Sequence, residues 1–176
     1  MVKEDKIKLL AMFSTIQSMN NGAIKLFSIN HDENTKNSDD NQFILPSAVL
    51  SAFTCELCLK AILIIEGQEI KKTHNLEKLF NLLKPDYKEE IKKNTILHLS
   101  KRSKNNVPVN FKAELCSIAN DFVDLRYFFQ DIESTKFHLT NYDFLIYFKL
   151  ATLQKFTEVE NKYANEMNSK LSSPNE

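Results

Sequence analysis

The feature that most limits the fold of this chain is its shortage of glycine: only Gly22 and Gly67 occur among 176 residues. Folds rich in β-structure need turn residues about every 8–12 positions, so this chain is not expected to form one. The shortage also excludes two kinds of site. Neither a glycine-rich phosphate loop nor a dinucleotide-binding fingerprint can be built from two isolated glycines. We therefore predict an all-α protein without Walker-type or Rossmann-type chemistry.

Apolar residues recur at steps of three and four through most of the sequence, which predicts an up-and-down bundle of five to six helices. Five of the predicted helices cover residues 4–28, about 46–66, 86 to about 100, 111–130, and 141 to about 169. A further short helix lies between the second and third of these, starts after Thr73 or Asn75, and is ended by Pro85. A chain of this length fits one domain. We expect that domain to span residues 1–170 and to be followed by a disordered tail, 171–176.

Charge and hydropathy limit the location and the partners. The 23 basic and 23 acidic side chains cancel, so any attraction to nucleic acid must come from a local patch. The first residues show no cleavage-like site of a signal peptide. No run reaches the ~18 apolar residues of a membrane span. We expect a cytoplasmic protein that does not insert into a membrane.

Cys55 and Cys58 form a C-x-x-C motif, which is found in zinc sites and in thiol redox sites. A structural zinc site needs four ligands, and the remaining cysteine, Cys116, has no histidine near it at ligand spacing. A redox pair places its first cysteine at the start of a helix after a strand, whereas Cys55 falls in the middle of a predicted helix. We expect both cysteines to be small buried side chains, and we expect no metal and no cofactor.

Glu56 and Lys60 interrupt this otherwise apolar helix at positions i and i+4. One interpretation is an ordinary surface pair, which contributes only ~0.3–0.5 kcal/mol. The other is a buried polar cluster between helices, because charges in a buried helix are costly unless polar groups meet them. In that case we expect Glu56 to pair with Arg126, with Tyr127 or Asp121 nearby.

Three segments, "ELCLKAIL", "KKTHNLEKLF" and "FVDLRYFF", resemble the HEPN domain superfamily of prokaryotes. Many members carry E-x-x-x-K on a helix that leads into a Gly-His-Asp-Leu-like turn, and an Arg-Tyr segment on a later helix. The corresponding positions here are Glu56, Lys60, Thr73 to Leu76, Arg126 and Tyr127. The turn departs from the pattern at Thr73 and Asn75. The resemblance covers roughly residues 5–165.

The resemblance implies a helical bundle that commonly forms a homodimer and works in toxin–antitoxin, antiviral-defence or other RNA-targeting systems. Many members are metal-independent ribonucleases with an R-x4–6-H motif paired across the dimer, in which arginine steadies the phosphate and histidine moves protons. Other members lack the motif and are non-catalytic partners. The implied partners are a second copy, RNA, and an antitoxin or a nucleotidyltransferase.

The R-x4–6-H motif is absent from this chain. Residues 107–109 after Arg102 read Val-Pro-Val, and residues 131–133 after Arg126 read Asp-Ile-Glu. We therefore interpret the protein as a dimeric RNA- or partner-binding module of a defence or toxin–antitoxin type system, with a degenerate catalytic motif. The alternative is an endoribonuclease with an atypical site that combines Arg126 with His74 or His138. His74 can equally be a structural bridge between helix ends.

Residues 88–104 carry six basic and two acidic side chains, a local excess of four positive charges. They can contact phosphates, or they can be the solvated face of a helix. The candidate binding residues are Glu56, Lys60, Tyr127, Lys92, Lys93, Lys101, Arg102 and Lys104. The apolar first half of the last predicted helix exceeds what one buried face needs, which favours packing against a second subunit.

Overall fold

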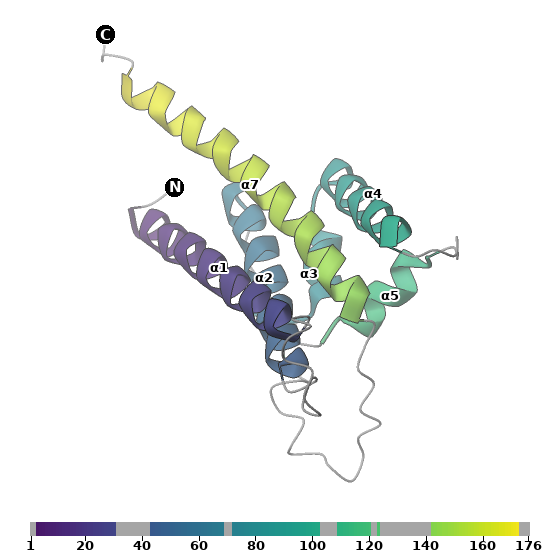
Figure 1. The fold of residues 1–176 in the computed structure, drawn as a ribbon. Coiled ribbons are helices and arrows are strands. Elements are labelled where there is room, and N and C mark those ends of the chain that lie inside the picture. Colours follow the sequence, from purple (N-terminus) through teal and green to yellow (C-terminus); the bar gives the residue numbers. More distant parts are fainter. Residues whose placement is uncertain are drawn as a thin grey trace.

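The computed structural model describes residues 3–30, 43–68, 72–102, 109–120, 123 and 142–172. The regular secondary structure of these residues is helical, with no strand among them, which confirms the predicted all-α class. The helices are α1 (Lys3–Asn30), α2 (Ile44–Ile65), α3 (Leu76–Leu82), α4 (Pro85–Arg102), α5 (Phe111–Ser117) and α7 (Tyr142–Ser172) (Figure 1).

The four long helices alternate in direction along the chain, as predicted for an up-and-down bundle. Ser47, near the start of α2, donates a hydrogen bond to the carbonyl of Ala23, near the end of α1, so these helices are antiparallel. The hydroxyls of Ser47 and Tyr142 lie 2.7 Å apart and join the starts of α2 and α7, which are therefore parallel. Glu90, early in α4, pairs with Lys155 near the middle of α7. His98, late in α4, stacks on Tyr147 near the start of α7, so α4 and α7 are antiparallel. Helix α7 thus packs between α2 and α4 (Figure 1).

Helix α2 lies at the centre of the hydrophobic core. Its apolar residues are buried around most of the helix, and the core also receives side chains from α1, α3, α4, α5 and α7. Among the described helices, α2 alone is long and apolar enough to cross a membrane, with a mean hydropathy of 2.1 over its most apolar window. In this fold 61% of that window is buried inside the protein, and the central helix of a bundle has the same composition.

Local signals account for the ends of the middle helices. Gly67 follows α2 with a φ of 72°, a left-handed conformation that glycine adopts without strain. Asn75 caps α3, because its side-chain oxygen accepts a hydrogen bond from the backbone N–H of Lys78. Helix α3 ends at Leu82, and Pro85 is the first residue of α4, where its missing N–H costs nothing.

Helix α5 is shorter than the predicted helix 111–130, which was wrong over residues 118–120. The structure ends α5 at Ser117 and continues with a turn. The carbonyl of Ala119 accepts a hydrogen bond of 2.7 Å from the N–H of Leu76, the first residue of α3. The first N–H groups of a helix have no partner within it, so a nearby carbonyl satisfies one of them. This tertiary contact occupies the Ala119 carbonyl, which in a continuous helix would accept a hydrogen bond from a residue four positions later.

Most of the apolar first half of α7 is covered by other elements of the chain. Phe144 and Phe148 are fully buried, and both pack against Phe111 of α5. Phe148 also contacts Phe80 of α3, with ring centroids 5.9 Å apart. Intramolecular packing therefore accounts for most of this apolar surface, although Leu150 in the same half of α7 is 37% exposed. The expectation of a second subunit stays a prediction that is supported mainly by the family resemblance.

Candidate functional site

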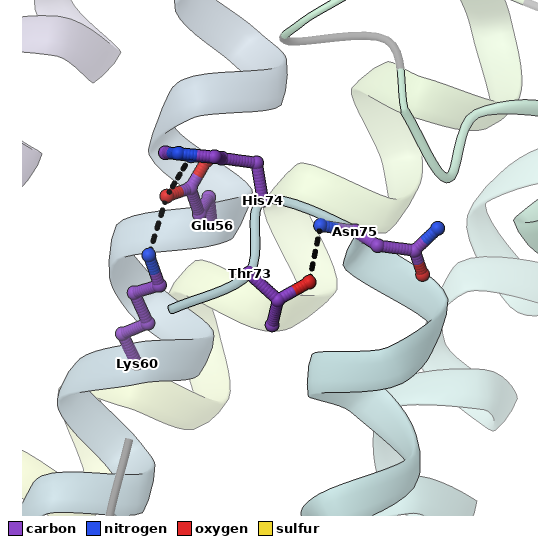
Figure 2. A network of polar contacts seen from close by, with 5 residues as sticks. All are labelled: Glu56, Lys60, Thr73, His74 and Asn75. Carbon is purple, nitrogen blue, oxygen red and sulfur yellow. Dashed lines mark hydrogen bonds and ion pairs between the residues drawn. The ribbon is translucent and has the colours of Figure 1, made fainter. Parts of the chain in front are cut away.

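The main polar network of the described core is centred on Glu56. Its carboxylate is only 2% exposed, yet it lies on α2 among apolar side chains. Lys60, one turn later, donates a hydrogen bond of 2.7 Å to Glu56 Oε1. His74, in the connection between α2 and α3, places Nδ1 3.0 Å and 3.1 Å from the two carboxylate oxygens (Figure 2). The surface-pair interpretation of Glu56 is therefore wrong, because its carboxylate is buried, and the described partner from outside α2 is His74, which the sequence pattern had not placed there.

The contact with Glu56 indicates which ring nitrogen of His74 carries a proton. An ionised carboxylate can only accept hydrogen bonds, so Nδ1 of His74 must carry the proton that it donates. In a neutral ring the lone pair then belongs to Nε2, and a carboxylate that orients a histidine in this way is the arrangement found behind general bases. The side chain of His74 is 56% exposed. The geometry is thus compatible with a structural bridge and with a proton carrier.

The turn that presents His74 is held at both sides. The backbone N–H of Asn75 donates to Thr73 Oγ1 at 3.2 Å (Figure 2). The side-chain amide of Asn75 donates to Asn120 Oδ1 at 2.8 Å while its oxygen caps α3. Asn75 therefore links the start of α3 to the residues that follow α5, directly beside the histidine.

Replacing Asn75 by alanine should lower the free energy of unfolding by about 1–2 kcal/mol, because the cap of α3 and the bond to Asn120 are both lost. Asn75→Asp should lose less, since a carboxylate still caps the helix but cannot donate to Asn120. Urea unfolding of both variants measures the difference. Equal losses in the two variants would contradict the assigned capping role.

Arg126 lies outside the described residues, as do Tyr127, Asp121 and His138. The pairing of Glu56 with Arg126 therefore stays a prediction. Among the described residues the partners of Glu56 are Lys60 and His74. The sequence contains both of them, but no spacing rule joins a glutamate to a histidine 18 residues later. The contact between Glu56 and His74 depends on the path of the α2–α3 connection, which the tertiary structure shows.

A model of the HEPN domain matches residues 33–122, which is half of the chain. The chain belongs to the HEPN domain family. Glu56, Lys60 and the turn with His74 fall within the match, whereas Arg126 and Tyr127 lie beyond it. No curated protein and no solved structure matches the chain.

The basic residues of this HEPN chain do not form one continuous face on α4. Lys92 is half-buried and lies 3.6 Å from Glu89, whereas Lys93 and Lys101 are exposed. Residues nine positions apart in a helix point about half a turn away from each other, so Lys92 and Lys101 face different sides. Arg102 ends α4, and Lys104 lies outside the described residues.

The cysteines of the C-x-x-C motif are buried, as predicted. Cys55 and Cys58 are both 0% exposed on α2, while Cys116 is exposed on α5. Burial raises the pKa of the Cys58 thiol well above its ordinary value, and the neighbouring Cys55 raises it further. A thiol of raised pKa is a poor nucleophile. The described residues contain no group of three potential metal ligands.

Lys149 is a buried cation whose burial could not be read from the sequence pattern. It lies on α7 with 2% of its surface exposed, and it interacts electrostatically with Cys55 and Cys58 of α2. Burial lowers the pKa of its ammonium group, and the two thiols oppose that change. The apolar pattern around it indicates a buried position, but a single lysine in such a pattern ordinarily extends to the surface.

Proposed function

We propose that this HEPN domain protein is an RNA-binding module that lacks the standard catalytic motif and acts as a dimer in a defence or toxin–antitoxin type system. The HEPN match supports the RNA-binding part of this proposal, and the network around Glu56 supports the non-catalytic part. Lys60 and His74 satisfy this carboxylate and join α2 to the start of α3, so the network stabilises the fold without a ligand. No arginine is followed by a histidine at the motif spacing.

A second candidate function is a metal-independent endoribonuclease. The observation that favours it is the contact of both Glu56 oxygens with Nδ1 of a half-exposed His74. Such a histidine can take a proton from a ribose 2′-hydroxyl if a cation steadies the phosphate. Arg126 is the candidate for that cation.

Incubation of the purified protein with total RNA in EDTA separates the two functions. We expect the RNA to be bound, as seen in a native gel, and to remain intact in a denaturing gel. His74→Ala and Arg126→Ala should leave the RNA intact as well. His98→Ala is the matched control, since His98 stacks on Tyr147 away from this network. Cleavage by the wild type that both His74→Ala and Arg126→Ala abolish, and that His98→Ala retains, would establish the ribonuclease instead.

The dimer is a separate part of the proposal. Size-exclusion chromatography with light scattering at micromolar concentration should give a mass of twice the 20.4 kDa of one chain. A mass of one chain throughout the micromolar range would contradict the homodimer and leave RNA binding to a single subunit.

A further inference from the structure

A cleft of about 800 Å³ opens between α4 on one side and α3 with the start of α5 on the other. Three lysines line it, and they come from two separate elements. Lys88 and Lys92 are one turn apart on α4, and Lys112 lies on α5. Lysines that are 20 or more residues apart in the sequence therefore converge on one space.

The charges of this cleft favour an anion. Its three lysines face two glutamates, Glu77 and Glu89, which leaves an excess of one positive charge. Glu89 lies 3.6 Å from Lys92, and the ammonium of Lys88 donates to a backbone carbonyl at 3.4 Å. Both interactions are long, and a phosphate oxygen can replace them at shorter distance.

The floor of the cleft is apolar and offers little aromatic surface. Phe80 and Phe111 line it but are 6% and 7% exposed, because their rings pack against each other and against α7. Bases that bind by stacking need an open aromatic face. A ligand in this cleft is therefore held by its charges and not by its bases.

We propose that this cleft binds the phosphate backbone of a single-stranded RNA segment, with Lys88, Lys92 and Lys112 as the phosphate contacts. This inference rests on the proposed RNA-binding function and names its site. The volume falls within the ~300–1,000 Å³ of small-ligand sites, which admits a short strand and not a duplex. Because the contacts are to phosphates, binding is independent of base sequence and falls steeply with salt.

Fluorescence anisotropy with a labelled 12-nucleotide RNA tests the site. Lys88→Ala, Lys92→Ala and Lys112→Ala should each weaken binding about three- to tenfold and reduce the salt slope by about one. Lys93→Ala and Lys101→Ala remove the same charge from other faces of α4 and should change binding less than twofold. Oligo(A) and oligo(U) should bind within about threefold of each other.

A gain of affinity supplies a second readout that damage to the fold cannot imitate. Glu77→Gln removes a negative charge from the cleft wall and should tighten binding about two- to threefold. Glu166→Gln, on α7 and outside this cleft, should have no effect.

The outcomes separate the site from the function. If the wild type binds RNA and the control lysines matter as much as the cleft lysines, binding is diffuse and the assigned site is wrong while the proposed function stands. If polyglutamate displaces RNA at equal charge concentration, the cleft selects charge alone and its assignment to RNA is overturned. If the wild type binds no RNA at low salt, the proposed function and the site both fail.

Discussion

Replacing Glu56 by alanine is expected to lower the free energy of unfolding by about 3 kcal/mol. The variant leaves a cavity in α2 and removes the acceptor of both Lys60 and His74. Lys60 is only 16% exposed, so its ammonium loses its partner in a largely buried place. The connection between α2 and α3 loses its link to the core at the same time. Urea unfolding followed by circular dichroism measures the change.

Two further variants identify the cause of this loss. Glu56→Gln keeps the shape and one acceptor oxygen, so it should cost less than alanine, and the difference separates the cavity from the charge. Glu89→Ala breaks an exposed pair with Lys92 and should cost under about 0.5 kcal/mol. A loss below about 1 kcal/mol for Glu56→Ala would show that the network does not hold the fold together.

Replacing Lys149 by methionine is expected to raise the free energy of unfolding by about 1–2 kcal/mol at pH 7. Burial lowers the pKa of Lys149 in the folded state below its usual 10.5, so the unfolded chain binds the proton more tightly. This penalty is fully present below the folded pKa and disappears as the pH rises towards 10.5. Methionine has a similar length and no charge, so it removes the penalty while filling the same space.

The pH dependence provides the decisive measurement. The stability difference between Lys149→Met and the wild type should be largest at pH 7 and should shrink at pH 10. Lys149 also lowers the pKa of the Cys58 thiol, so the same comparison is made in a background that carries Cys55→Ala and Cys58→Ala. Lys162→Met makes the same substitution at an exposed position of α7 and should change stability by less than about 0.5 kcal/mol. A Lys149→Met variant that is less stable than the wild type would contradict the argument.

Much of the candidate site could be predicted because it depends on local spacing. Glu56 and Lys60 are four residues apart on one helix, and the apolar residues around them indicated that the helix is buried. The burial of Cys55 and Cys58 follows from the same pattern. Asn75, which caps α3, is one of the two residues after which the sequence predicted that this helix starts.

Contacts between distant segments could not be predicted in this way. His74 reaches Glu56 because of the course that the α2–α3 connection takes, and no periodicity encodes that course. The cleft forms because α4 lies opposite α3 and the start of α5, so that Lys112 lines the same space as Lys88 and Lys92. A pattern along one chain segment places a side chain on a helix face, but not the neighbour that the face will meet.

Sequence patterns alone predicted that this protein is a bundle of helices with a charged pair in its central helix. Two glycines do not supply the turns of a β-fold, and apolar steps of three and four specify helices. The packing of the helices places His74 against Glu56, ends α5 at Ser117 and buries Lys149. Each of these depends on which backbone and side-chain groups meet after the helices pack, because a polar group removed from water must find its partner among the neighbours that packing provides.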